Sequence, residues 1–257
     1  MSVLSAKELP TLSLLYKLGK LIPAQAGTKV PTTLSFRSTE PIAPSKALND
    51  RVCLVRHDIT KLAVDAITNA ANRRLLGGGG IDGAIHAAAG PDLLAECRKL
   101  GGCATGSAKI TGAHRLPCQK VIHAVGPMYD LVEPEESEEL LTSAYNTVLN
   151  LAVDNGCKSL ALCGISTGIY GYPPFEAAPV AISAVKKFLE GEKGQKLEKV
   201  VFVTWVKQDV DSYEEFLPSS TTDTAEAAQA KEVASKLPDV PRSEPGDSEH
   251  PEKKQKQ

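Results

Sequence analysis

The sequence has no long hydrophobic run, no excess of charge of either sign and no closely spaced pair of cysteines. None of its apolar stretches approaches the ~18 residues that a membrane-spanning helix needs. Its 29 basic and 31 acidic residues leave a formal net charge of −2, so no global basic field favours duplex nucleic acid. We therefore expect neither a membrane span nor a duplex nucleic-acid partner in these 257 residues, a length that suits one α/β domain with extensions.

The six cysteines form no C-x-x-C pair, and several lie within apolar runs. Thiols in such positions are typical of a reduced, intracellular protein. The chain does not open with the charged and then apolar pattern of a signal peptide. Its first forty residues contain few acids, which is a feature of organelle transit sequences. We expect a location in the cytoplasm or nucleus, ahead of the mitochondrion.

Composition divides the chain into three parts. Residues 1–50 place apolar residues at helical spacing over 6–21 and then become rich in Pro, Thr and Ser, which predicts a helix and an arm that packs on the domain or tethers it. Residues 51–218 form the expected domain. Residues 219–257 are polar, contain several prolines and have no aromatic residue, which predicts a disordered tail. Its terminal lysines are either a nuclear-targeting or interaction patch, or part of a solvated tail.

Apolar strands alternate with amphipathic helices along residues 51–218. Strands that are apolar on both faces indicate a sheet covered by helices on both sides, so we predict an α/β fold. The predicted strands are 51–56, 64–68, 106–111, 120–124, 159–163 and 200–206, and the predicted helices are 83–89, 91–100, 134–155, 174–189 and 211–217.

Four consecutive glycines, 77–80, lie between a predicted strand and a predicted helix. Glycine loses the most backbone freedom on folding, so such a run indicates close approach to the backbone or turns with positive φ. Unpaired N–H groups and the positive end of the helix dipole meet at such a place, which suits a phosphate. A second loop with three glycines, 164–173, has the same setting, and two such loops suit a diphosphate held from both sides. The alternative for each loop is an ordinary strand-to-helix turn.

Two common nucleotide motifs do not fit the first loop. The glycines at 78, 80 and 83 satisfy G-x-G-x-x-G, but eight residues separate them from the strand, and no acid ends a strand about twenty residues later. A Walker loop fails because no Gly-Lys-Ser/Thr follows. The sequence therefore disfavours both a nicotinamide site and a P-loop.

Polar residues near these loops are candidates for ligand contact. Asp58 follows the first strand, where it can accept from an exocyclic amine or cap a turn. Asn69 and Asn72 lie at a strand end, where an amide suits a sugar hydroxyl or a turn. Asp82 opens the helix after the glycines, as an N-cap or as a group facing the ligand, and His86 lies one turn later. A carboxylate at a helix N-terminus is stabilised as the anion, so we expect Asp82 to orient water or ribose rather than remove a proton unaided.

Four motifs carry a resemblance to a known family. The sequence reads NAAN at 69–72, LLGGGGIDGAIH at 75–86, VIHAVGP at 121–127 and GISTG at 164–168. Together they resemble a macrodomain, specifically the MacroD-type mono-ADP-ribosylhydrolases, over about residues 51–218. The resemblance implies a three-layer α/β/α sandwich around a mixed sheet of about six strands.

The resemblance also implies a site for ADP-ribose. Asp58 and Ile59 would hold the adenine, the two glycine loops the diphosphate, and Asn72, Asp82 and His86 the distal ribose. Tyr170 would cover that ribose, and Trp205 would stack on the adenine or else lie in the core. The implied catalytic residues are Asn72, Asp82 and His86; the implied ligand-binding residues are Asp58, Ile59, Asn69, Gly79, Gly80, Ile81, Gly83, Ser166, Thr167, Gly168, Ile169, Tyr170 and Trp205.

The activity so implied is removal of mono-ADP-ribose from acidic side chains of modified proteins, with cleavage of O-acetyl-ADP-ribose as a side activity. No metal and no cofactor is expected, and the protein would act as a monomer. Water would attack, positioned by the phosphate of the substrate and by Asp82, with Asn72 fixing the ribose and His86 orienting it. Two alternatives remain open: a module that binds ADP-ribose without cleaving it, and a phosphatase acting on ADP-ribose 1″-phosphate.

Overall fold

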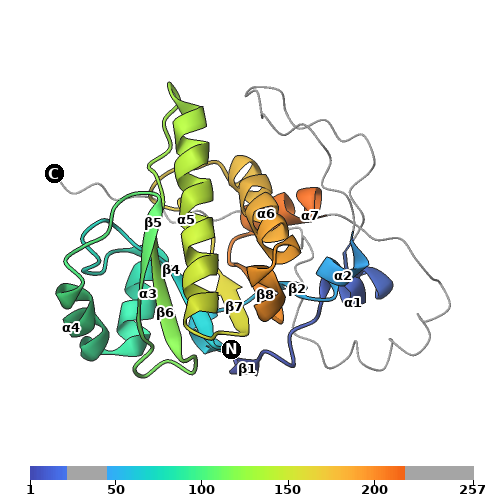
Figure 1. Cartoon of the computed structure of the whole chain (residues 1–257), viewed down its shortest axis with the longest axis horizontal. Helices are drawn as coiled ribbons and strands as arrows, with labels where there is room; N and C mark the ends of the chain where they lie inside the picture. The colour runs from blue at the N-terminus through green and yellow to red at the C-terminus, as the bar shows by residue number, and fades with distance from the viewer. Residues whose placement is uncertain (22–44, 218–257) are drawn as a thin grey trace.

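A computed structural model describes residues 1–21 and 45–217, and a six-stranded mixed sheet forms its centre (Figure 1). All neighbouring strands pair in parallel except β5, which pairs antiparallel with β6 at one edge. The predicted mixed sheet of about six strands is thus confirmed. Across the sheet the order is β2 (Val52–Arg56), β8 (Lys199–Thr204), β7 (Ser159–Leu162), β4 (Ala66–Ala70), β6 (Lys120–Val125) and β5 (Ser107–Gly112).

Helices cover both faces of this sheet and complete three layers. One face packs against α3 (Gly80–Ala89) and α4 (Pro91–Lys99). The other packs against α5 (Pro134–Asp154) and α6 (Pro174–Glu190), which lie side by side in Figure 1. The last helix, α7 (Lys207–Phe216), contacts α6.

The strands are apolar on both faces because each of them contributes side chains to two hydrophobic cores, one on each side of the sheet. In β2, Val52 and Leu54 lie in the core under α5 and α6, whereas Cys53 and Val55 lie in the core under α3 and α4. Successive side chains of a strand point to opposite faces, so an unbroken apolar run is what a doubly covered strand requires. All six cysteines are free, and all except Cys103 are buried.

The N-terminal segment takes part in the fold. The helix predicted over 6–21 is shorter: α1 spans Leu12–Lys17 and is N-capped by Thr11. Before it, β1 (Leu4–Ser5) pairs in parallel with β3 (Leu62–Ala63). Buried leucines of α1 join the core under α6, so these residues are packed on the domain rather than merely tethered to it. Three short elements complete the described chain: α2 (Lys46–Asn49), η1 (Ile59–Lys61) and η2 (Lys193–Lys196).

Three predicted element boundaries that bear on the site are wrong. The helix α3 begins at Gly80 rather than at residue 83, so Asp82 lies inside its first turn. The strand β8 ends at Thr204, which leaves Trp205 beyond the sheet. The strand β4 runs to Ala70 and therefore contains Asn69. Helix ends depend on local hydrogen bonding, which periodicity does not encode. The predicted arm at 23–44 and tail at 219–257 lie outside the described residues. Among the described residues, none of the helices combines the length and the apolar character that a membrane span needs.

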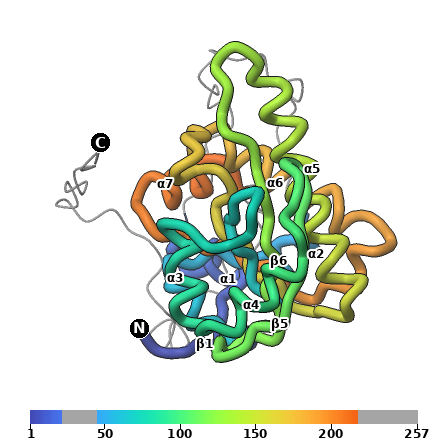
Figure 2. Tube along the Cα trace, turned by 90° about the vertical axis from the view of Figure 1, so that its left-hand side faces the viewer, coloured from blue at the N-terminus to red at the C-terminus, as the bar shows by residue number. Residues whose placement is uncertain are grey.

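The parallel strands send their loops to one edge of the sheet. The loops after β2, β4, β6, β7 and β8 all leave from the carboxyl ends of parallel strands. In open α/β sheets this edge is where ligands bind. The segment between β6 and α5 extends furthest from the body, and Figure 2 shows it as the green loop at the top.

At the opposite edge of the sheet, one carboxylate links the starts of neighbouring strands. Asp65 Oδ2 accepts from the backbone N–H of Lys158 and from the N–H and hydroxyl of Ser159, each at 2.9 Å. Its Oδ1 accepts from Gln119 Nε2 at 2.8 Å. One side chain before β4 thus joins the starts of β7 and β6.

We expect Asp65→Ala to lower the free energy of unfolding by about 2 kcal/mol, because several hydrogen bonds to a charged acceptor are lost together. Urea unfolding at pH 7 measures the change. Glu198→Ala is the control, because Glu198 pairs with Lys158 on the exposed surface and such pairs contribute little. Equal effects of the two substitutions would contradict the role given to Asp65.

Candidate functional site

The first glycine loop is shaped by its own backbone contacts. Asn72 Nδ2 donates to the carbonyl of Gly77 at 2.9 Å, and its Oδ1 accepts from the N–H of Arg74 at 3.0 Å. Gly77 and Gly80 have φ of 79° and 61°, a region that glycine enters without strain. The glycine run is therefore needed for turns with positive φ, and Asn72 holds the loop closed.

Gly83 packs directly against this loop. A Cβ at Gly83 would lie 2.6 Å from the carbonyl oxygen of Gly78. Real Cβ atoms essentially never come within 3.0 Å of another heavy atom of this kind. A Cβ at Gly78 would lie 3.1 Å from Asp82 Oδ2 and 3.4 Å from Asn72 Nδ2. The absence of side chains thus lets the loop approach both the helix α3 and two polar side chains.

The second loop follows β7 and contacts the first. Ser166 has a φ of 67°, and its carbonyl accepts from the N–H of Tyr172 at 3.0 Å. The carbonyl of Tyr170 accepts from the N–H of Tyr129 at 2.9 Å, which attaches the loop after β6. Ile169 is 78% exposed and reaches the first loop, with Cδ1 3.3 Å from the position of a Cβ on Gly79. The structure therefore brings the two predicted loops together.

Gly126 explains why the loop after β6 also begins with a glycine. A Cβ there would collide with Ser166 Oγ and would lie 2.6 Å from Ile165 Cγ2. Only a residue without a side chain lets this loop lie against the loop after β7. Ser166 Oγ is itself buried and makes no hydrogen bond within the described residues.

Asp82 is buried beneath the glycine loop and is 4% exposed. The helix α3 is capped by Gly79 without a side-chain hydrogen bond, so the alternative of Asp82 as the N-cap is wrong. Its Oδ1 instead accepts from Asn69 Nδ2 at 2.8 Å. His86 Nε2 lies 3.4 Å from the same oxygen, within ion-pair distance but without hydrogen-bond geometry. Asp82 therefore faces the loop with one oxygen anchored.

Asn69 continues into a network that the sequence did not predict. Its Nδ2 lies 3.0 Å from His123 Nδ1, and His123 Nε2 lies 2.9 Å from Thr111 Oγ1. Asn69 and His123 are partners across β4 and β6, and Thr111 lies on the neighbouring β5. Burial, and then the charge of His86, lower the pKa of His123 to about 4. Sequence spacing gives no sign of Thr111, and the sequence shows His123 only as part of the VIHAVGP motif.

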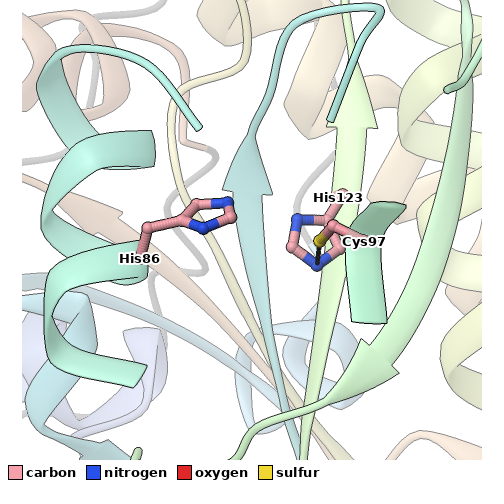
Figure 3. A group of neighbouring side chains, drawn as sticks. All are labelled: His86, Cys97 and His123. Carbon is pink, nitrogen blue, oxygen red and sulfur yellow. Dashed lines mark hydrogen bonds between the residues drawn. The ribbon is translucent and has the colours of Figure 1, made fainter. Parts of the chain in front are cut away.

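One group of potential metal donors occurs among the described residues, namely His86, Cys97 and His123 (Figure 3). Their donor atoms lie within 4.8 Å of one another. Both ring nitrogens of His123 already have polar partners, and burial raises the pKa of the Cys97 thiol to about 11. A metal needs the thiolate and a free imidazole lone pair, so hydrogen bonding accounts better for this group.

The remaining predicted residues lie at the same edge of the sheet. Asp58 caps η1, and its Oδ1 accepts from the N–H and the hydroxyl of Thr60, so its predicted capping alternative is confirmed. Ile59 is buried in the core under α3, and Ile81 packs at its margin. Trp205 is 58% exposed, which rules out the core position considered for it. Thr167 lies in the second loop, where a Cβ on Gly164 would meet its Oγ1 at 2.5 Å.

The fold and the loops define a three-layer α/β/α protein with two glycine loops at the carboxyl edge of its sheet. Residues 68–181 match the family described as Macro domain. The chain is 53% identical over 163 residues to the Macro domain-containing protein CT2219 of Chlorobaculum tepidum. The aligned residues cover 63% of this chain and 93% of that protein. The chain belongs to the macro domain family.

Two further relatives carry more specific descriptions. The ADP-ribose glycohydrolase MACROD2 of Xenopus laevis is 47% identical over 194 residues, covering 74% of this chain but 46% of that protein, so the chain spans about half of that relative. The crystal structure of the Trypanosoma brucei macrodomain in complex with ADP-ribose superposes with a TM-score of 0.62 at 42% identity, covering 68% of this chain and 72% of that chain.

We expect the stability of the protein to fall between pH 7.5 and pH 5 by about 2 kcal/mol through His123 alone. Its pKa is about 4 in the folded chain against 6.5 for the free side chain, so the unfolded chain takes up the proton first as the pH drops. The titratable groups that lie next to His123 are His86 on α3 and Cys97 on α4, and Asn69 connects its ring to Asp82.

Urea unfolding of the wild type and of His123→Asn at both pH values measures this contribution. Carboxyl groups that titrate in the same range are common to the two proteins and cancel in the comparison. The stability of His123→Asn should depend less on pH, and an unchanged dependence would contradict a buried neutral imidazole.

Proposed function

We propose that this chain binds ADP-ribose at the carboxyl edge of the sheet and hydrolyses mono-ADP-ribose from acidic side chains of modified proteins. The observation that carries the proposal is the buried carboxylate of Asp82, which faces a side-chain-free loop while a neighbouring amide anchors it. The description of MACROD2 as an ADP-ribose glycohydrolase, and the ADP-ribose in the Trypanosoma brucei structure, support the same activity.

The diphosphate would lie between the two glycine loops. The first loop ends in the N-terminus of α3, whose free N–H groups and dipole favour a negative charge. Gly79, Gly80 and Ile81 supply that backbone. Residues 166–170 approach from the other side, where the exposed Ile169 reaches Gly79 of the first loop.

The two ends of the ligand would meet different residues. Asp58, next to the buried Ile59, would accept from the adenine amine, and the exposed ring of Trp205 would stack on the base. Tyr170 would cover the distal ribose. Because the contacts of Asp58 with Thr60 use Oδ1, the proposed contact with adenine falls to Oδ2.

The distal ribose would lie over Asn72, Asp82 and His86. Asp82 Oδ2 and Asn72 Nδ2 both approach the empty side of Gly78, one as an acceptor and one as a donor. This pair would fix the ribose and a water molecule. In the reaction a water oxygen bonds to the ribose C1″, the C1″–O bond breaks, and the side-chain carboxylate leaves. The proton of the water passes to a phosphate oxygen of the substrate, and oriented proximity supplies much of the rate.

No metal or cofactor takes part in this proposal, and O-acetyl-ADP-ribose would be cleaved at the same site as a side activity. Two other functions use the same pocket. A reader would bind ADP-ribose and release nothing, whereas a phosphatase would prefer ADP-ribose 1″-phosphate. An acid buried next to the place of the distal ribose favours the hydrolase, because binding alone does not require it.

We expect Asp82→Ala to lower the turnover of a glutamate-linked mono-ADP-ribosylated protein by about 100-fold or more, while the Kd for ADP-ribose changes by less than about threefold. Release of ADP-ribose and calorimetry with ADP-ribose are the two measurements. Asp92→Ala is the matched control, because Asp92 is an exposed acid in the first turn of the next helix.

Three outcomes separate the candidate functions. Equal loss of binding and turnover in Asp82→Ala would remove its catalytic role. Binding without release by the wild type would make the protein a reader. Faster turnover of ADP-ribose 1″-phosphate than of the modified protein would make it a phosphatase.

We expect Gly83→Ala to weaken ADP-ribose binding by about tenfold or more, because its methyl group displaces the carbonyl of Gly78 and with it the loop. Calorimetry measures the affinity. In Gly112→Ala the new Cβ meets its nearest neighbour, Glu96, at 3.5 Å, so that variant should bind as the wild type does. Unchanged binding by Gly83→Ala would show that the loop does not hold the ligand.

A further inference from the structure

Beneath the site, a hydrogen-bonded chain runs through three neighbouring strands. It begins at the carbonyl of Gly112 and passes through Thr111 on β5, His123 on β6 and Asn69 on β4 to Asp82 on α3. Its four side chains are at most 4% exposed. Buried polar groups in the low-dielectric interior cost free energy unless each has a hydrogen-bond partner. This requirement constrains which group donates and which accepts at each step of the hydrogen-bonded chain.

The direction of each hydrogen bond follows from the carboxylate. An ionised carboxylate only accepts, so Asn69 must present its nitrogen to Asp82. The second hydrogen of that nitrogen points to His123 Nδ1, which must therefore carry a lone pair. The proton of the neutral imidazole then lies on Nε2.

The far end of the chain agrees with this assignment. His123 Nε2–H donates to Thr111 Oγ1 at 2.9 Å, and the Thr111 hydroxyl donates to the carbonyl of Gly112 at 3.0 Å. Cys97 Sγ lies 3.6 Å from the same ring nitrogen and is the weaker acceptor. Figure 3 marks this contact with a dashed line. Every polar hydrogen from Thr111 to Asn69 thus has an acceptor.

We propose that His123 and Thr111 are positioning residues that act through Asn69 to hold the Asp82 carboxylate in its productive orientation. The inference rests on the proposed hydrolase function. With Oδ1 anchored by Asn69, Oδ2 is directed toward the glycine loop at Gly78. If the imidazole changed tautomer, its Nδ1–H would face the Asn69 amide N–H, and the amide would turn and release the carboxylate.

The hydrogen-bonded chain leaves one buried acceptor unpaired, and this unfavourable feature is consistent with the proposed role. Asn69 Oδ1 is buried and makes no hydrogen bond within the described residues. Leaving such an acceptor unpaired costs free energy, and turning the amide would place that oxygen against the carboxylate instead. In the observed orientation Asn69 Oδ1 is unpaired and Asn69 Nδ2 donates to Asp82. This is the orientation that positioning of the carboxylate requires.

Thr111→Val tests the inference, because valine has the shape of threonine but cannot accept from His123. We expect kcat for release of ADP-ribose from a glutamate-linked substrate to fall about tenfold, with KM and the Kd for ADP-ribose within about twofold of the wild type. Thr111→Ser keeps the hydroxyl and should restore most of kcat. Thermal unfolding of both variants checks that they are folded.

Nitrogen-15 NMR of the imidazole gives a readout that a merely structural role would not move. The wild type should show His123 neutral at pH 7 with its proton on Nε2, whereas Thr111→Val should show a mixture of tautomers. A wild-type proton on Nδ1, or an imidazolium, would overturn the inference. A kcat for folded Thr111→Val equal to that of the wild type would also overturn it.

The test separates this inference from the proposed function. If the wild type binds ADP-ribose but releases none from the modified protein, the proposed function fails whatever the variants do. The NMR measurement does not depend on turnover. A mixture of tautomers in the wild type would overturn the proposed positioning role independently of the proposed function. Turnover by the wild type combined with failure of Thr111→Ser to restore kcat would count against positioning through the hydroxyl.

Discussion

The parallel pairing of five strands is the constraint on which the site depends. Parallel strands end at the same edge, so loops that are far apart in the sequence must gather there. The loops after β4, β6 and β7 touch one another through Gly79, Gly126 and Ser166. A carboxylate at Asp65 ties the opposite ends of three strands together, which fixes their stagger and therefore the relative heights of these loops.

The glycines of the site serve the contacts between loops as much as the turns within them. Gly83 leaves room for the carbonyl of Gly78, and Gly126 leaves room for Ser166. A methyl group at either position would push one loop away from its support. The backbone that is proposed to hold a diphosphate is thus kept in place by the absence of side chains around it, and a rigid first shell of this kind limits the reorganisation needed on binding.

The polar groups below the loops form a single hydrogen-bonded unit. The face of the sheet under α3 is apolar at Ile67 and Val121 and becomes polar one step further along the same strands, at Asn69 and His123. This change occurs where the sheet meets Asp82, so the buried polar side chains of this face lie where they hold a carboxylate. The neutral state of His123, with its lowered pKa, makes that arrangement possible without a second buried charge.

By itself the sequence determined the fold class, the helix order, the two glycine loops and the family, because apolar periodicity and the NAAN, GGGG and GISTG motifs are local properties of the chain. It also named Asn69, Asn72, Asp82 and His86 as neighbours of one loop. Only the tertiary structure decided that Asp82 is anchored by Asn69 rather than capping α3, that Trp205 is exposed, and that Thr111 and His123 lie beneath the site. Those facts depend on which strands pair and in what register. Pairing between residues as far apart as Asn69 and His123, which are 54 residues apart, leaves no periodic signal in a single sequence.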